Sequence, residues 1–206
     1  MTILSNIEQS LLTISLGFRQ NELAYLALTS KIEHAIRDKI AFHLQENLTF
    51  SIVAREWRFI LNSKKKLIDI AVVDSEGKET SLIEIKAIYT LEAFLKRKTS
   101  FKDVLNYDKE KLEGFESKNA VERYLLLLAT HPNIQSVIIQ PFDKIIKYSG
   151  YINRFFNASG VDYSQDAKNI IDQHCSTLDK NFICDVIDAG KKFNIDVRIY
   201  WWLIKL

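Results

Sequence analysis

The chain has 206 residues, of which 47% are hydrophobic and 26% are charged, and it contains only six glycines and two prolines. Such a composition is typical of a compact α/β or α+β protein with a substantial core, and it excludes a disordered or fibrous chain. The net charge of +2 does not indicate nucleic-acid binding by itself, because phosphate binding depends on clustered charge rather than total charge.

The N-terminal segment gives no sign of export. Residues 1–17 lack the basic region, the continuous apolar run and the cleavage site of a secretory signal. No stretch of the sequence reaches the roughly 18 apolar residues of a membrane span. We therefore expect a cytoplasmic protein without a membrane partner.

The first predicted element is a helix over residues 21–46. Its apolar residues recur at the three-to-four spacing of an amphipathic helix, at Ile32, Ile36, Ile40 and Leu44. Ser30 is a candidate cap for this helix.

Strands are predicted next. Residues 50–60 are rich in β-branched and aromatic side chains and predict a strand, and residues 61–66 predict a loop. Residues 67–89, LIDIAVVDSEGKETSLIEIKAIY, form two apolar runs joined by a polar turn, which is the pattern of a β-hairpin.

The second half of the chain predicts a helix over residues 100–115 and a central strand over 121–130, whose nearly unbroken apolar run fits burial on both faces. Residues 135–142 fit either a short strand or the start of a helix. Residues 163–192 predict one or two helices ending near Gly190, and 193–206 predict a closing strand.

Two cysteines, Cys175 and Cys184, fall within the predicted helical segment. They have no His or Cys neighbours at metal spacing, so we predict small core residues rather than ligands or a disulfide. No repeat or Pro/Gly-rich linker divides the chain. The predicted fold is one α/β domain over residues 1–206, with a central mixed sheet flanked by helices.

Three charges lie inside the apolar runs of the hairpin: Asp69, Glu84 and Lys86. Alternate residues of a strand share a face, so Glu84 and Lys86 are neighbours. A two-residue loop at Glu76-Gly77 pairs Val73 with Thr80 and places Asp69 opposite Glu84. Two carboxylates so placed destabilise the sheet unless a cation lies between them.

Two interpretations of these charges remain open. On a half-exposed sheet both acids face solvent and Lys86 pairs with one of them, for about 1 kcal/mol at most. Alternatively, because their neighbours on the same faces are apolar, the acids form a site. Two carboxylates and an ammonium suit metal-assisted phosphoryl chemistry, in which oxygen ligands hold a hard cation and the positive group orients a water.

Asp69, followed after fourteen residues by Glu84-Ile85-Lys86, resembles the PD-(D/E)XK motif of the restriction-endonuclease-like superfamily. The predicted order of elements over about residues 25–130 is similar to the αβββαβ core of that superfamily. Ile68 replaces the proline of the motif. The resemblance implies that Asp69 and Glu84 bind Mg²⁺ or Mn²⁺ with the Ile85 carbonyl, and that Lys86 positions or activates the attacking water.

Glu33 is an independent candidate from the upstream helix. On a helical wheel it falls within the apolar stripe, between Ile40 and Leu44, where an unpaired charge is costly. It either pairs with Arg37 at i,i+4 or, as the resemblance implies, completes the acidic metal cluster.

The remaining candidates are less specific. Two basic clusters flank the hairpin and either contact a phosphate backbone or are solvated charges: Lys64, Lys65 and Lys66, and Lys96, Arg97, Lys98 and Lys102. The four histidines show no metal spacing, and the tryptophans Trp57, Trp201 and Trp202 are predicted in core or subunit contacts. No dinucleotide, P-loop or serine-hydrolase motif is present.

The expected function is metal-dependent hydrolysis of nucleic-acid phosphodiesters, with DNA as the favoured substrate. A homodimer is expected because cutting both strands at one place usually requires two active sites. The alternatives are a catalytically inactive member of the same superfamily that binds or scaffolds, and an α/β interaction protein in which the motif arose by chance.

Overall fold

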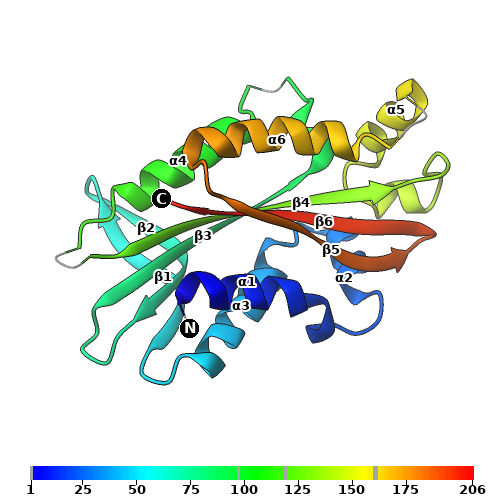
Figure 1. The fold of residues 1–206 in the computed structure, drawn as a ribbon. Coiled ribbons are helices and arrows are strands. Elements are labelled where there is room, and N and C mark those ends of the chain that lie inside the picture. Colours follow the sequence, from blue (N-terminus) through cyan, green and yellow to red (C-terminus); the bar gives the residue numbers. More distant parts are fainter. Residues whose placement is uncertain (1, 97, 118–119, 160–161) are drawn as a thin grey trace.

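Six strands form one open mixed sheet in a computed structural model that describes residues 2–96, 98–117, 120–159 and 162–206 (Figure 1). The spatial order is β1-β2-β3-β4-β6-β5. Neighbouring strands are antiparallel except β3 and β4, which are parallel. The strands are β1 (Ile52–Leu61), β2 (Lys64–Val73), β3 (Glu79–Tyr89), β4 (Glu122–Asn133), β5 (Ile183–Lys192) and β6 (Ile195–Lys205).

Helices cover both faces of the sheet. Figure 1 shows α1 (Ile3–Thr13), α2 (Glu22–Thr29) and α3 (Glu33–Asn47) on one face, and α4 (Phe101–Glu113) and α6 (Ser164–Leu178) on the other. Each face buries its own apolar cluster. The other helical segments are α5 (Ser149–Ser159) and the short η1 (Ile14–Gly17), η2 (Thr90–Ala93) and η3 (Phe142–Lys144). The expected central mixed sheet flanked by helices is confirmed.

No helix within the described ranges is long and apolar enough to cross a membrane.

Several predicted elements are confirmed, namely β1, the strands of the hairpin, α4, β4 and β6. The order helix, three strands, helix, strand is present from α3 to β4. The β4 strand lies between β3 and β6, which explains its unbroken apolar run. Trp201 and Trp202 are buried core residues as predicted, and Trp57 is half-buried.

The single helix predicted over residues 21–46 is wrong, because the chain turns between α2 and α3. Ser30 takes an extended conformation and closes the end of α2 instead of capping the start of the next helix. Its hydroxyl donates to the Leu26 carbonyl at 2.8 Å. The Tyr89 hydroxyl donates to the Ala27 carbonyl at 2.6 Å, so partners distant in sequence satisfy the last carbonyls of α2.

The helices predicted over residues 163–192 are only half correct. Helix α6 ends at Leu178, and the following residues form the edge strand β5. Gly190 lies in that strand, at a register shift with φ of +88°, and a Cβ there would lie 2.6 Å from Asn21 Oδ1. Cys175 is buried in α6 as predicted, whereas Cys184 lies in β5 and is half-buried; neither forms a disulfide.

Two connecting segments also differ from the prediction. The expected loop over residues 61–66 shrinks to a two-residue turn at Asn62 and Ser63, both with positive φ, so the three lysines that follow belong to β2. Residues 135–142 form neither a strand nor an α-helix; only Phe142 enters the short η3.

The pairing of β2 with β3 has the expected register in its middle but not at the turn. Ile70 pairs with Ile83 as predicted, whereas Val73 pairs with Glu79 because the register shifts by one residue. The turn is longer than two residues, because residues 74–78 separate the two strands. Within the turn, the Asp74 side chain accepts hydrogen bonds from two backbone N–H groups. Gly77 has the expected positive φ, +80°.

Candidate active site

Asp69 lies where the regular pairing of β2 with β3 stops. The last paired residues are Ile70 and Ile83, and the next positions along the same register are Asp69 and Glu84. There the Asp69 side chain takes the place of a backbone carbonyl as hydrogen-bond acceptor: its Oδ2 accepts a hydrogen bond from the Ile85 N–H at 2.8 Å. The two carboxylates therefore lie at neighbouring positions on adjacent strands, as the register predicts.

Glu84 is buried beneath α4 and contacts a lysine from that helix. The residue is 5% exposed, and its Oε1 accepts from the Lys111 ammonium. Its other oxygen, Oε2, is buried without a hydrogen-bond partner among the described residues. Burial, together with the charge of Asp69, raises the pKa of Glu84 above that of a free carboxyl, against the effect of Lys111. The interpretation of a solvent-facing Glu84 is wrong.

Lys86 lies between two acids that come from helices on opposite faces. Its Nζ is 3.7 Å from Asp108 Oδ2 on α4 and 3.9 Å from Glu33 Oε2 on α3. Burial by itself lowers the pKa of Lys86, but the Asp108 and Glu33 carboxylates outweigh burial and raise it. Lys86 is therefore an ammonium at neutral pH.

Glu33 points toward β3 and not toward Arg37. Its Oε2 accepts a hydrogen bond from the Ala87 N–H at 3.2 Å, in addition to the ion pair with Lys86. The alternative of an i,i+4 pair with Arg37 is not what the structure has. Arg37 instead contacts Glu56 at 3.1 Å and Asp69 Oδ1 at 3.8 Å, as well as its neighbour Asp38.

The structure thus brings together all four predicted side chains and adds three that the sequence prediction missed: Arg37 as a partner of Asp69, Asp108 and Lys111. A signal for Asp108 was present. Asp108 lies three residues after Leu105 and four before Leu112, so helical periodicity places it on the buried face of α4. Glu33 was identified in the same way, as a charged residue within an apolar stripe. The sequence does not indicate which strand residue each of these three side chains contacts.

The donor set suits a hard divalent cation, because carboxylate oxygens converge at the site and the buried Glu84 Oε2 has no hydrogen-bond partner in the described part of the chain. The arrangement is nevertheless not a ready-made ligand cage. Within the ranges that the structure describes, no group of three or more His, Cys, Asp or Glu side chains is disposed to hold a metal ion. The ammonium of Lys111 already neutralises one oxygen of Glu84.

A groove of about 600 Å³ opens beside the site, between the β1–β2 turn and α4. Lys64, Lys66, Tyr107 and Lys111 line it together with three glutamates, Glu110, Glu113 and Glu116. Lys66 donates to the Tyr107 hydroxyl. Of the predicted basic clusters, Lys64, Lys65, Lys96, Lys98 and Lys102 are exposed, and Arg97 lies outside the described residues.

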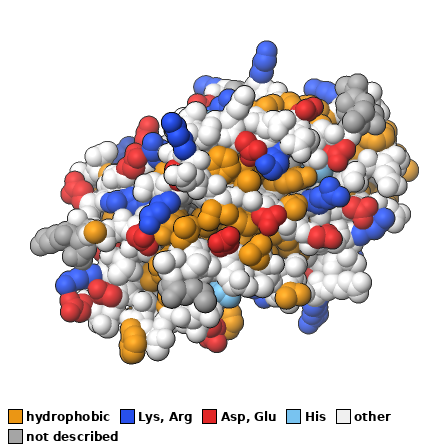
Figure 2. Space-filling view, in the orientation of Figure 1, with side chains coloured by type: hydrophobic (Ala, Val, Ile, Leu, Met, Phe, Trp, Pro, Cys, Tyr) orange, Lys and Arg blue, Asp and Glu red, His pale blue; other side chains and the backbone are white. Residues whose placement is uncertain are grey.

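Charges of both signs are interspersed on the face of the molecule that Figure 2 draws. Figure 2 shows lysine and arginine side chains among aspartates and glutamates on the face drawn, without one continuous basic area. Any nucleic-acid contact on this face therefore depends on local clusters of lysine and arginine side chains.

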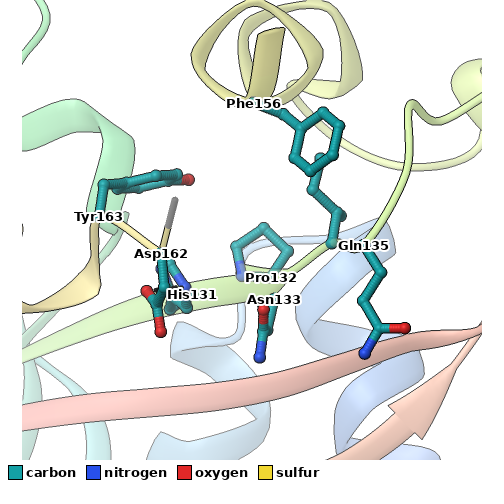
Figure 3. Close-up of a pocket in the computed structure, with 8 residues that line it drawn as sticks. His131, Pro132, Asn133, Gln135, Phe156, Asp162 and Tyr163 are labelled. Atoms are coloured by element: carbon teal, nitrogen blue, oxygen red, sulfur yellow. Dashed lines mark ion pairs between the residues drawn. The ribbon is translucent and has the colours of Figure 1, made fainter. Parts of the chain in front are cut away.

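A second cavity, of about 360 Å³, lies at the end of β4 and is lined by His131, Asp162 and Tyr163 (Figure 3). His131 Nδ1 is 2.9 Å from Thr90 Oγ1, and its Nε2 is 3.1 Å from Asp162 Oδ1. A hydroxyl, an imidazole and a carboxylate in this order resemble a nucleophilic triad. Thr90 is completely buried, however, so no substrate can reach its hydroxyl, and the cluster is structural.

Acid should destabilise the protein through His131. Burial lowers the pKa of His131 to about 4, from 6.5, and Arg198 adds to this against the opposing effect of Asp162. Between these values the unfolded chain binds the proton and the folded protein does not, so stability is lost as the pH falls from 6.5 to 4, by roughly 3 kcal/mol. Urea unfolding against pH should show this loss in the wild type and a flatter profile in His131→Gln. The exposed His34→Asn should match the wild type, and an equally steep profile in His131→Gln would assign the acid sensitivity to other groups.

Comparisons with protein families, with curated proteins and with solved structures return no significant match to this chain. The site must therefore be interpreted from its own geometry.

Proposed function

We propose that the protein is a metal-dependent nuclease of the restriction-endonuclease-like class that hydrolyses phosphodiester bonds, with DNA as the favoured substrate. The observation that carries this proposal is the convergence of Asp69, Glu84 and Lys86 with Glu33, from three separate elements, around a buried carboxylate oxygen that has no hydrogen-bond partner within the described ranges. The order of elements from α3 to β4 and the spacing of the motif support it.

In this proposal Asp69 and Glu84 hold Mg²⁺ or Mn²⁺ with the Ile85 carbonyl, and Glu33 completes the acidic cluster. The bound cation would supply charge stabilisation to the phosphate and lower the pKa of a water. Lys86 acts as an ammonium: the Asp108 and Glu33 carboxylates keep it charged, so it orients the water or stabilises developing negative charge rather than removing a proton.

The partners follow from the same chemistry. Lys64 and Lys66 on β2 line the groove and would contact the phosphate backbone together with the exposed Lys65 of the same strand. A homodimer would supply the second active site required to cut both strands, and the protein would act in the cytoplasm.

The direct test is nicking of supercoiled plasmid with Mg²⁺ or Mn²⁺. Asp69→Asn should lower the rate at least about a hundredfold. Asp166→Asn, at an exposed position on α6, is a matched control and should leave nicking unchanged. If the wild type does not nick with either metal, or if Asp69→Asn nicks normally, the proposed activity is wrong.

The second candidate function is a non-catalytic binding or scaffold module with the same fold. Two observations favour it: the lysine bound to Glu84, and the lack of a three-carboxylate or mixed metal-binding group among the described residues. Binding of DNA without nicking in either metal would support this candidate.

A further prediction concerns Glu33. Glu33→Gln keeps an acceptor for the Ala87 N–H but removes one negative charge beside Lys86. Nicking should fall, and the metal concentration for half-maximal nicking should rise roughly tenfold. The stability without metal should stay the same or increase, because one like charge leaves the acidic cluster.

Its control is Glu46→Gln, at an exposed position on the same helix. Melting and metal titrations on the same samples decide the role of Glu33. A metal titration identical to that of Glu46→Gln would limit Glu33 to a structural role.

A further inference from the structure

We propose that the Lys111 ammonium occupies the place of the divalent cation beside Glu84 and must leave before the cation binds. This inference rests on the proposed metal site and adds a regulatory contact to it. Lys111 lies on α4, is 9% exposed, and reaches across the point where β2 and β3 stop pairing.

The Lys111 ammonium is surrounded by oxygen atoms of the kinds that bind hard cations. Its Nζ contacts Glu84 Oε1 and lies 3.0 Å from the Leu67 carbonyl oxygen. These are a carboxylate and a backbone carbonyl from two adjacent strands, the oxygen donors that Mg²⁺, Mn²⁺ and Ca²⁺ prefer. Lys111 therefore neutralises a carboxylate pair that would otherwise repel.

The ammonium and a divalent cation cannot share Glu84 without strong repulsion. Of the two Glu84 oxygens, Oε2 alone has no hydrogen-bond partner among the residues that the structure describes. A cation bound there would lie next to the Lys111 ammonium on Oε1 of the same carboxylate. Lys86 does not compete for Glu84, since the acids with which it forms ion pairs are Asp108 and Glu33.

A destination for the displaced ammonium is present. Lys111 lines the groove of about 600 Å³ that also exposes Glu110, Glu113 and Glu116. A flexible lysine stem can turn into this groove, where Glu110 and Glu116 replace the lost partner while Glu113 stays paired with Lys109. Metal binding would then exchange one ion pair for another rather than leave a charge unpaired.

Lysine labelling of the wild type tests the displacement directly. With acetic anhydride and mass spectrometry, Lys111 should be protected without metal and react at least about fivefold faster in saturating Ca²⁺. Lys109, on the same helix with its side chain 31% exposed, is the control and should react equally in both conditions. Continued protection of Lys111 at Ca²⁺ saturation would overturn the inference.

Calorimetric titration with Ca²⁺ gives a second, independent measurement. Lys111→Gln keeps a hydrogen-bond donor but removes the competing charge, so the Kd for Ca²⁺ should fall about tenfold or more relative to the wild type and to Lys109→Gln. If Lys111→Gln does not fold without Ca²⁺, it should fold when Ca²⁺ is added, and the labelling of the wild type still decides.

The outcomes separate this inference from the proposed function. Equal Ca²⁺ affinity in the wild type and Lys111→Gln would overturn the competition and leave the metal site standing. Absence of Ca²⁺ binding in both proteins would overturn both. Tighter binding in Lys111→Gln without any nicking by the wild type would support the competition and reject the nuclease.

Discussion

Lys86→Ala is expected to lower the rate of metal-dependent nicking at least about a hundredfold, because it removes the only ammonium that lies between Glu33 and Asp108 among the described residues. Most metal affinity should remain, since Lys86 is not a ligand. The measurement is a single-turnover nicking rate at saturating Mg²⁺, together with Ca²⁺ affinity by calorimetry.

Lys86→Ala is also expected to destabilise the fold. Lys86 is the ion-pair partner of Asp108, whose side chain is only 4% exposed. Removing one member of a buried pair leaves a charge uncompensated, so a loss of about 3 kcal/mol in the free energy of unfolding is expected.

The double variant Lys86→Ala/Asp108→Asn is the control for this loss. It should recover most of the stability and none of the activity. Normal turnover in either folded variant would remove Lys86 from the mechanism.

Divalent cations are expected to raise the melting temperature by about 5–10 °C at concentrations a hundredfold above the Kd. A ligand that binds only the folded protein stabilises it by about 2.7 kcal/mol at that concentration, and a domain of this size gains a few degrees for each kcal/mol. The physical source is the neutralisation of Asp69 and Glu84 by a doubly charged cation in place of the single charge of Lys111.

Glu84→Gln and Asp69→Asn should abolish most of this thermal response, for different reasons. Glu84→Gln removes the oxygen that has no hydrogen-bond partner among the described residues. It also leaves Lys111 without its counter-charge, so its stability without metal should fall. Asp69→Asn keeps an acceptor for the Ile85 N–H while removing one of two repelling charges, so its stability should hold or increase.

Differential scanning calorimetry with and without Mg²⁺, Mn²⁺ or Ca²⁺ measures these responses. A melting curve that saturating metal leaves unchanged in the wild type would show that the carboxylate pair is not a metal site.

The predictions from the sequence were correct where a local pattern is compatible with only one structure. The middle register of the hairpin was predicted correctly, as the pairing of Ile70 with Ile83 confirms, although the predicted turn was wrong and a one-residue register shift between Val72 and Val73 compensates for it. The wheel position of Glu33 correctly indicated a carboxylate turned toward the protein interior. Both inferences work because strand and helix periodicity fix the direction of each side chain.

Interpretation failed where local patterns are degenerate. The apolar residues of 183–192 fit a helix or a half-buried edge strand, and pairing with β6 decided for the strand. The periodicity of residues 21–46 continues through Ser30, but the Tyr89 hydroxyl satisfies the carbonyls at the end of α2. A hydrogen bond between residues 62 positions apart leaves no trace in local sequence.

The sequence by itself determined the central sheet, the order of elements from α3 to β4 and the four acidic and basic residues first assigned to the site. Only the tertiary structure decided their partners: Arg37 with Asp69, Asp108 with Lys86, and Lys111 with Glu84. The reason is physical. Periodicity states which face of a helix is buried, but the choice of a partner for each buried charge depends on how α3 and α4 pack across the strands, and the cost of an unpaired charge acts only after that packing forms.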